Sequence, residues 1–381
     1  MAATDRYDVI VVGVGSMGSA ACAHLARRGL KTLGLERYDI PHGMGSHHGF
    51  TRIIRLAYYE HPSYVPLLRR AFTLWDELQQ WYGEQLLHVT GTIDASGEDE
   101  VVFQGSLASC LLHDIPHEVL DGDELHARFP GYRLPSSHRA LFQPDGGFLI
   151  PEACIVAHTL AAAEAGATIK AREGVLSWVA DGDGVTVTTA KGTYRADQLV
   201  LSAGAWMGKL LPNFAPLAVP ERQVLGWFQP LAPAEFTPAT FPVFNLLVPE
   251  GRYYGFPVHG VPGFKIGRYH HLDEIVDPDD FEREPNARDE AVLREVTAKY
   301  FPDAAGETVG LRACMFTNTP DEHFIIDRLP GTPNVVVASP CSGHGFKFAS
   351  VIGEIIADVV QRDDTSLDIG LLRMAEDRWQ A

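Results

Sequence analysis

The stretch at 8–36, DVIVVGVGSMGSAACAHLARRGLKTLGLE, constrains the fold of this chain more than any other part of it. It opens with an apolar, β-branched run that is typical of a fully buried parallel strand, and it continues into a helical pattern and a second apolar run. Between the first run and the helical pattern, Gly13, Gly15 and Gly18 have G-x-G-x-x-G spacing. Glu36 closes the stretch about 20 residues later, where an acidic side chain can bind a ribose hydroxyl.

The three glycines have different physical roles in such a stretch. One allows the tight turn, one lets the backbone approach a pyrophosphate, and one lets the helix pack closely on the strand. The phosphates would lie at the helix N-terminus, where free N–H groups and the helix dipole favour an anion. We therefore predict an adenine dinucleotide site. The alternative is a glycine-rich turn in an α/β fold that binds nothing.

Length, charge and cysteine content narrow the class of protein. With 381 residues and a usual size of about 150 residues per domain, we expect two domains. The net charge of −18 argues against nucleic acid or an anionic membrane surface as a partner. We expect neither a signal peptide nor a transmembrane helix, because no long uninterrupted apolar segment is present. The five cysteines are widely spaced and form no CxxC pair, which indicates a cytoplasmic protein without a disulfide framework or a zinc site.

Hydrophobic periodicity predicts the remaining elements. Helices are expected at 63–83, 152–166, 289–300 and 349–360, and buried strands at 199–202, after a hairpin, and at 334–339. Residues 215–320 alternate polar with apolar side chains, as an antiparallel sheet does. We expect a discontinuous dinucleotide-binding domain and a second sheet domain. The dinucleotide domain would comprise 1–85, 150–215 and 321–381, and the sheet domain 86–149 and 216–320.

Several residues outside the glycine-rich stretch could carry chemistry. Arg55 could bind a carboxylate bidentately, or it could be a surface arginine on a polar loop. Lys265 lies in an alternating strand, where an inward lysine would be costly unless it is paired, although a solvent-facing lysine is the commoner case. Lys347 follows a glycine-rich strand-to-helix turn, a place where a helix N-terminus can face an anion. By composition alone, Cys314 is only a small core residue.

Five long motifs point to a known family. They are GSHHGFTRIIR at 45–55, YYGFP at 253–257, FKIG at 264–267, CMFTNTPDEHFIID at 314–327 and SGHGFKFAS at 342–350. In these motifs, and over nearly its whole length, the chain resembles the monomeric sarcosine oxidase and N-methyltryptophan oxidase family of amine-oxidising flavoproteins.

The resemblance implies a fold, a cofactor and a reaction. The fold would be α/β, with an FAD-binding Rossmann-like domain of the glutathione-reductase type and an antiparallel-sheet substrate domain. FAD would be linked covalently through the sulfur of Cys314, as an 8α-S-cysteinyl bond. The substrate would be a small secondary amino acid, whose C–N bond is oxidised to an imine while O2 is reduced to peroxide. We expect a monomer without a metal site, since His47 and His48 have no matched Asp, Glu or Cys cluster nearby.

The resemblance also implies site residues. Catalytic roles fall to Lys265, Arg52, His270 and Tyr254, with Lys265 matching the lysine at which oxygen is activated. Substrate contacts fall to Arg55, Lys347, Tyr254 and Phe316, with Arg55 and Lys347 matching the pair that binds the carboxylate. The implied cofactor contacts are Gly13, Gly15, Ser16, Met17, Gly18, Glu36, Arg37, Ser46, His47, His48, Thr51, Arg52, Val175, Ala203, Gly204, Trp206, Cys314, Gly343, His344, Gly345 and Lys347.

Departures from the family pattern lie near the expected pocket. Phe50 replaces an acidic residue, and Phe316 replaces a tyrosine, which removes a hydroxyl from the pocket wall. Tyr269 stands where the family has its active-site histidine, and His270 follows it, so either residue could meet the substrate. Further departures are Leu56, Pro340 and Cys341.

These departures leave alternatives open. One is an oxidase of a bulkier or cyclic secondary amino acid, of the N-methyltryptophan, proline or pipecolate type. Another is a flavin-binding relative without catalytic activity. A third is a nicotinamide-dependent reductase on the same dinucleotide fold, against which the lack of a second G-x-G-x-x-G motif argues.

Overall fold

The glycine-rich stretch lies in the middle of an eight-stranded sheet. The computed structural model describes residues 6–339 and 342–374. Strand β1 (Arg6–Val12) is flanked by β2 and β12 and is parallel to both, so its apolar residues are buried on both faces. The other strands of the sheet are β2 (Thr32–Leu35), β9 (Thr168–Lys170), β10 (Val175–Ala180), β11 (Val185–Thr189), β12 (Thr193–Leu201), β18 (Ile325–Leu329) and β19 (Thr332–Ser339).

Strand β12 combines two elements that the sequence predicts as separate. Its first half pairs antiparallel with β11 as the second arm of the predicted hairpin. Its second half, Leu199–Leu201, pairs in parallel with Val335–Val337 of β19. The prediction of a hairpin followed by a separate strand is therefore wrong in this detail, because one continuous strand does both.

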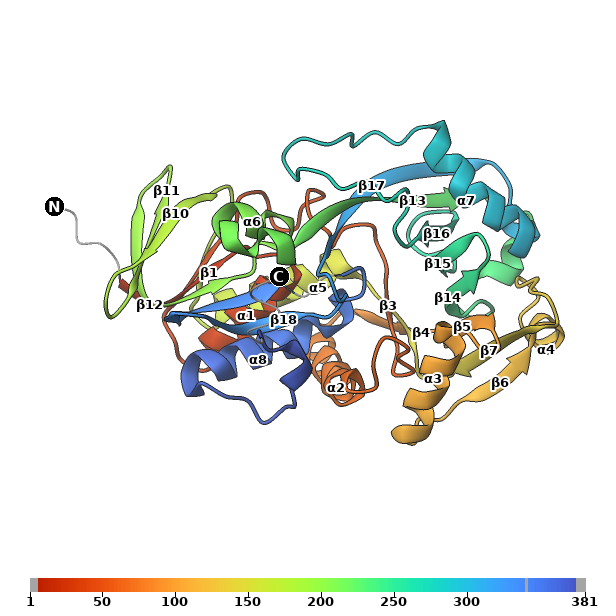
Figure 1. Cartoon of the computed structure of the whole chain (residues 1–381), viewed down its shortest axis with the longest axis horizontal. Coiled ribbons are helices and arrows are strands. Elements are labelled where there is room, and N and C mark those ends of the chain that lie inside the picture. The colour runs from red at the N-terminus through yellow and green to blue at the C-terminus, as the bar shows by residue number, and fades with distance from the viewer. Residues whose placement is uncertain (1–5, 340–341, 375–381) are drawn as a thin grey trace.

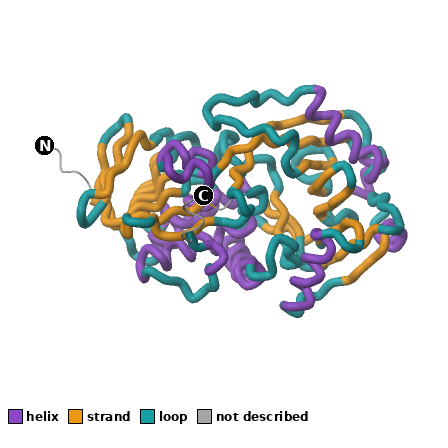
Figure 2. Tube along the Cα trace, in the orientation of Figure 1, coloured by secondary structure: helices purple, strands orange, loops and turns teal. Residues whose placement is uncertain are grey.

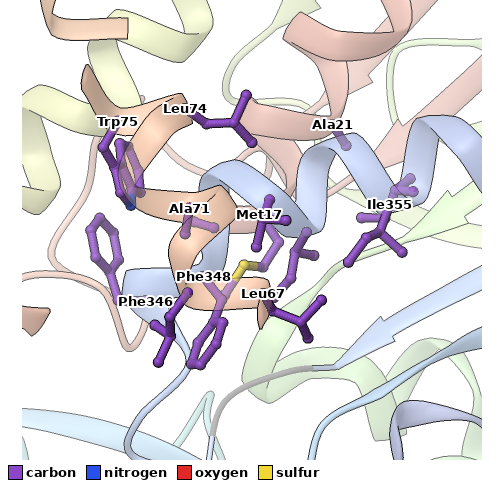
Figure 3. Packing of buried hydrophobic residues seen from close by; sticks show 14 of the residues in the cluster. Met17, Ala21, Leu67, Ala71, Leu74, Trp75, Phe346, Phe348 and Ile355 are labelled. Carbon is purple, nitrogen blue, oxygen red and sulfur yellow. The ribbon is translucent and has the colours of Figure 1, made fainter. Parts of the chain in front are cut away.

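Four helices form one layer against this sheet (Figure 1). They are α1 (Ser16–Arg27), α2 (Tyr64–Tyr82), α5 (Pro151–Glu164) and α8 (Ala349–Arg362). Helices α1 and α8 cross closely, since a Cβ added at Gly353 would lie 2.6 Å from the Ala20 backbone. Figure 3 shows Met17 of α1 beside Leu67 and Ala71 of α2 and beside Phe348, in the turn just before α8, with Ile355 of α8 in the same cluster. The side-chain core of this layer thus joins segments from both ends of the chain.

A second sheet forms the other part of the molecule, at the right in Figure 1. Its strand order is β17-β13-β16-β15-β14-β5-β7-β6, and all its pairs are antiparallel except β14 with β5. The strands are β5 (Thr92–Gly97), β6 (Glu118–Asp121), β7 (His138–Gln143), β13 (Val219–Phe228), β14 (Val243–Val248), β15 (Gly251–Phe256), β16 (Phe264–Arg268) and β17 (Thr308–Asn318).

Three helices accompany the second sheet: α3 (Val101–Leu112), α4 (Gly122–Arg128) and α7 (Ala287–Tyr300). Helix α7 begins at a capping box, in which Asn286 accepts from the Asp289 backbone and the Asp289 side chain accepts from the Asn286 backbone. A small third sheet, β3-β8-β4, contains β3 (Arg52–Ile54), β8 (Gly147–Leu149) and β4 (Leu87–Val89). Figure 2 shows the strands gathered in separate groups, and the predicted α/β fold with a second, mainly antiparallel sheet is confirmed. Over the described ranges 6–339 and 342–374, every helix is too short or too polar to cross a bilayer.

Candidate active site

The three motif glycines have the geometry that a dinucleotide site requires. Gly13 has φ +88°, and a Cβ there would lie 2.6 Å from the Ser202 carbonyl oxygen. A Cβ at Gly18 would lie 1.7 Å from the Gly13 carbonyl oxygen, so α1 can approach β1 only with glycine at this position. Gly15 lines a cavity, and a Cβ there would meet only the His47 ring at 3.3 Å. Turn, helix packing and ligand approach are thus divided among the three as predicted.

Glu36 is held at the end of β2, facing the same cavity. Its Oε2 accepts a hydrogen bond from the Val14 N–H at 2.9 Å, and its Oε1 accepts from the Tyr38 N–H at 2.9 Å. Burial would raise the pKa of Glu36, but His42 and the two backbone N–H groups together lower it. The carboxylate is therefore ionised and fixed before any ligand binds.

The cavity beside these residues has a volume of about 170 Å³. Most of the predicted cofactor contacts from the first sheet line it. They are Gly13, Gly15, Ser16, Met17, Glu36, Arg37, Ser46, His47, Val175, Ala203, Gly204 and Trp206. Gly18 is buried behind this wall, between α1 and β1.

Two smaller cavities continue from this one towards the second sheet. The next, of about 50 Å³, shares Ser16, Met17, Ser46 and His47 with the first. The third, of about 40 Å³, shares Arg52, Phe316, Gly343 and Phe346 with the second. The three form a row that begins at the glycine motif and ends under the second sheet.

An elongated dinucleotide cofactor fits this row chemically. Ser46 Oγ, His47 Nε2 and His48 Nε2 are buried polar atoms without a hydrogen-bond partner among the described residues. Buried polar atoms are rarely left unpaired, and Ser46 and His47 line the first two cavities, so their free atoms are suited to bind a ligand there. Burial lowers the pKa of His47 and of His48 to about 3, so both rings are neutral.

Lys265 is buried on β16 and binds the loop that contains these histidines. Its Nζ donates to the Gly49 carbonyl oxygen at 2.7 Å and to the carbonyl oxygen and Oγ1 of Thr51, both at 2.9 Å. Only 2% of Lys265 is exposed, so the alternative of a solvent-facing strand lysine is wrong. Burial lowers its pKa, and Arg52 lowers it further.

Arg52 lines the second and third cavities and ties the same loop together. Its guanidinium donates to the carbonyl oxygens of Thr51 and Ser46, both at 2.9 Å, and to that of His48. Cys314 on β17 is a free, buried thiol in an apolar cluster with Tyr254 and Phe316. Burial raises the pKa of this thiol, while Arg52 opposes the rise.

Arg55 is also buried, with 1% of it exposed, which excludes the alternative of a surface arginine. Its Nη2 donates to both carboxylate oxygens of Glu60, at 2.7 and 2.9 Å, and Nη1 donates to the Ala57 carbonyl oxygen. The faces of Tyr58 and Tyr59 lie 4.4 and 4.5 Å from the guanidinium carbon. A cation with this many contacts is rigid, and it lines the third cavity.

Lys347 lies across the same cavity, in the turn before α8. Its Nζ donates to the His344 carbonyl oxygen at 2.7 Å, and its own carbonyl oxygen accepts from Trp75 Nε1 at 2.8 Å. Burial, together with the nearby Arg55 charge, lowers the pKa of Lys347 to about 7. Two buried basic side chains thus line one small cavity, an arrangement that is chemically suited to a carboxylate when Lys347 is protonated.

Aromatic and polar side chains complete this third cavity, here called the carboxylate cavity. The residues are Asn245, Tyr254, Phe256, Tyr269 and Phe316, with Ile53, Gly343, His344 and Phe346. Tyr254 and Phe316, predicted from the sequence, are among them. Sequence analysis missed Asn245 and Glu60, although an acidic residue five positions after Arg55 is a signal that could have indicated a partner.

His270 is not brought to this cavity, whereas Tyr269 is. Tyr269 directly follows β16 and lines the cavity, whereas His270 lies in the turn after it with φ +51°. There His270 Nδ1 lies 2.8 Å from Glu221 Oε2, and Nε2 lies 3.0 Å from Glu322 Oε1. The two carboxylates raise the pKa of His270 to about 9. The catalytic role expected for His270 therefore stays a prediction, while Tyr269 is the one of the two residues that lines the cavity.

The other departures from the family pattern lie in different surroundings. Phe50 is 43% exposed, has φ +70°, and packs edge-on against Trp227. Leu56 is half-buried against the core of the first layer. Pro340 and Cys341 lie outside the described residues.

Comparison with known proteins agrees with this architecture. A family model described as FAD dependent oxidoreductase matches residues 8–359. Monomeric sarcosine oxidase of Bacillus sp. (strain NS-129) is 42% identical over 378 residues, which cover 98% of this chain and 97% of that protein. N-methyl-L-tryptophan oxidase of Citrobacter koseri is 39% identical over 372 residues, which cover 96% and 97%.

Among solved structures, NikD is described as an unusual amino acid oxidase essential for nikkomycin biosynthesis. It superposes with a TM-score of 0.85 at 29% identity, and the match covers 97% of this chain and 98% of that chain. The resemblance that the motifs indicated is thereby confirmed. This chain belongs to the family of FAD-dependent oxidoreductases, among relatives that include monomeric sarcosine oxidases and N-methyl-L-tryptophan oxidases.

Proposed function

We propose that this enzyme is an oxidase of N-methyl or other secondary amino acids. The observation that carries the proposal is the pair of buried cations, Arg55 and Lys347, in a cavity at the end of the row that fits a dinucleotide. The family match to FAD-dependent oxidoreductases supports FAD as the dinucleotide in this row. Relatives that act on sarcosine or N-methyltryptophan, by their names, supply the substrate class.

The protein's own residues would position the substrate and stabilise charge. FAD, when bound, supplies the chemistry that accepts a hydride equivalent from the C–H next to the amine nitrogen and passes electrons to O2. Arg55 and Lys347 would bind the substrate carboxylate, which orients the amine without taking part in bond changes. Tyr254, Tyr269 and Phe316 would exclude water from the reacting carbon.

Lys265 would act on the oxygen half of the reaction. A buried cation fixed by three hydrogen bonds can stabilise the negative charge that develops on O2 as it is reduced, without having to reorganise. We expect Lys265→Met to slow reoxidation by O2 by orders of magnitude while substrate binding changes little. Equal rates of oxygen consumption in mutant and wild type would remove Lys265 from the mechanism.

A covalent bond between Cys314 and FAD is part of the proposal. The thiol is free, and it lies in one cluster with Tyr254 and Phe316, which line the carboxylate cavity. Acid precipitation tests the bond, because covalent flavin stays in the pellet. A colourless pellet with all flavin in the supernatant would contradict it.

We also infer a monomeric, cytoplasmic enzyme with two domains. The FAD-binding domain would comprise 1–85, 150–215 and 321–381, and the substrate domain 86–149 and 216–320. The two sheets, each with its own hydrophobic core, support this division. The relatives named monomeric sarcosine oxidase support the oligomeric state, which sedimentation of the purified protein would test.

Anaerobic mixing with a substrate panel tests the reaction class. The panel contains sarcosine, N-methylalanine, N-methyltryptophan, proline and pipecolate, each with its primary or acyclic counterpart. Loss of the visible flavin band with one of them would establish both the reaction and the size of the substrate. The volume of about 40 Å³ favours a small substrate, while the aromatic walls and the N-methyltryptophan relatives support a bulkier one. A flavin that no member reduces would contradict the proposed activity.

A further inference from the structure

Asp94 is a fully buried carboxylate beside the carboxylate cavity that the reaction described above does not use. It lies on β5, and its Oδ2 accepts from Ser106 Oγ at 2.8 Å and lies 3.7 Å from Arg55 Nη1. Its Oδ1 accepts from Asn245 Nδ2 at 2.7 Å. A buried carboxylate is costly unless its oxygens are paired. Of the three partners of Asp94, Arg55 and Asn245 line the cavity, and Ser106 does not.

The strand pairing brings Asp94 and Asn245 together. Strands β5 and β14 are the one parallel pair in the second sheet, and Asp94 and Asn245 are directly opposite in its register. Their side chains therefore leave the sheet on the same face, the face that carries Asn245 into the cavity beside Arg55 and Lys347. The insertion that contains β5 thus contributes to the substrate site through this pair.

Asp94 determines which end of the Asn245 amide faces the cavity. A carboxylate only accepts hydrogen bonds, so the Asn245 NH2 group must be the end that points at Asp94. Burial raises the pKa of Asp94, while the Arg55 charge and the hydrogen bonds from Asn245 and Ser106 oppose the rise. Among the hydrogen bonds of the described residues, Asn245 takes part through its NH2 group, which leaves its carbonyl oxygen available on the side of the cavity that Asn245 lines.

We propose that Asn245 is a specificity-determining residue and that Asp94 is the positioning residue that orients it. The cavity would select amino acids that present an N–H or O–H donor to the Asn245 carbonyl oxygen while their carboxylate binds Arg55 and Lys347. This inference rests on the proposed function, because it needs a carboxylate at those two cations. One such hydrogen bond corresponds to a preference of about three- to tenfold in Kd.

Pairs of small acids of equal shape test the preference without turnover. Glycolate and propionate differ by a hydroxyl in place of a methyl group, and 3-hydroxypropionate and butyrate differ in the same way one carbon further out. None has a C–N bond to oxidise. Their Kd values follow from the shift of the visible flavin band of the oxidised holoenzyme. We expect the hydroxy acid of at least one pair to bind about three- to tenfold more tightly.

Three variants at these two positions, with one control variant elsewhere, separate the roles of Asn245 and Asp94. Asn245→Leu should bring the preference to about one, whereas Asn213→Leu, the same change at an exposed position, should leave it as in the wild type. Asp94→Asn should keep the preference, because the new amide oxygen still accepts from Asn245. Asp94→Leu should lose it, with flavin content and Tm measured to show that the variant is folded.

The outcomes distinguish this inference from the proposed function. If no acid binds to the wild type, the carboxylate site itself is wrong. If acids bind but the wild type shows no preference, or Asn245→Leu retains it, the role of Asn245 is wrong. If Asp94→Asn behaves like Asn245→Leu, Asp94 does not act by orienting the amide. The Asp94→Asn result decides this last point even if Asp94→Leu does not fold.

Discussion

The pKa of Lys347 makes carboxylate binding dependent on pH in a predictable way. Burial and the neighbouring Arg55 lower this pKa to about 7. An anionic ligand binds the ammonium form, so each deprotonated molecule must first take up a proton before it binds. With this pKa, about nine tenths of Lys347 is charged at pH 6 and about 3% at pH 8.5. The Kd of propionate should therefore rise about thirtyfold between these two pH values.

The pKa values of the other titratable groups around the Lys347 ammonium lie outside the range from pH 6 to pH 8.5, with one exception. Arg55 stays charged, and Tyr58 has a pKa well above its usual value because it is buried. Burial lowers the pKa of His344 to about 4. Although burial opposes it, Arg55 lowers the pKa of Glu60 to about 2. The exception is Asp94, whose pKa burial raises.

Titration of the oxidised holoenzyme with propionate at pH 6, 7, 8 and 8.5 measures this dependence through the visible flavin band. Lys347→Met should bind propionate weakly at pH 6 and with the same Kd at all four pH values. Asp94→Asn should keep the slope of the wild type. A wild-type Kd that stays constant would show that Lys347 keeps its proton or does not meet the carboxylate. If the pH dependence of the Kd persists in Lys347→Met and disappears in Asp94→Asn, the group that takes up the proton is Asp94 and not Lys347.

Three further predictions concern folding and cofactor binding. His270 has a pKa raised from 6.5 to about 9 by its two carboxylate partners, so its contribution is fully present below pH 6.5 and is lost as the pH rises through 9. His270→Gln should lower the free energy of unfolding in urea by about 1–2 kcal/mol at pH 6, a value discounted because the ring is partly exposed, and by little above pH 9.5. Gly18→Ala should yield protein without flavin, since the added methyl would overlap the Gly13 carbonyl oxygen, and the ratio of visible to ultraviolet absorbance measures this. Arg222→Met should lower stability by about 3–5 kcal/mol in urea unfolding, because the fully buried Asp289 would lose a bidentate partner at 2.8 and 2.9 Å.

Each of these predictions has an outcome that would contradict it. The His270 effect would be wrong if the loss of stability were the same at both pH values. The Gly18 argument has a control in Gly192→Ala, at a hairpin position where the nearest atom to a new Cβ is 3.9 Å away, and equal flavin content in both variants would refute it. The Arg222 estimate fails if the variant unfolds at the urea concentration of the wild type.

The sequence predicted well those features that depend on residues close together in the chain. The glycine motif and Glu36 lie in one continuous βαβ unit, so their spacing already determines their geometry. The family motif left the choice between Tyr269 and His270 open, and the turn after β16, where His270 has φ +51°, places Tyr269 in the cavity wall. Local periodicity also located the helices to within a few residues.

Features that depend on distant strand pairing could not be predicted in the same way. The burial of Arg55 and Lys265 follows from tertiary packing, and by composition either residue could have been exposed. Asp94 and Asn245 meet only because β5 pairs with β14, across a sequence separation of 151 residues. No local pattern marks such a pair, so the polar wall of the carboxylate cavity appears only in the folded structure.

The pairing of β12 also sets the order in which this enzyme can mature. Strand β12 pairs on one side with β1, the strand that precedes the glycine motif, and on the other side with Val335–Val337 of β19. During synthesis on the ribosome, β12 therefore lacks one of its two partner strands until β19 has been made. Contacts between such distant segments form slowly, because a long loop must be ordered first. Because Ala338 of β19 also lines the cavity beside the glycine motif, that cavity is complete only after β19 has been synthesised, and we expect flavin to bind to the finished chain.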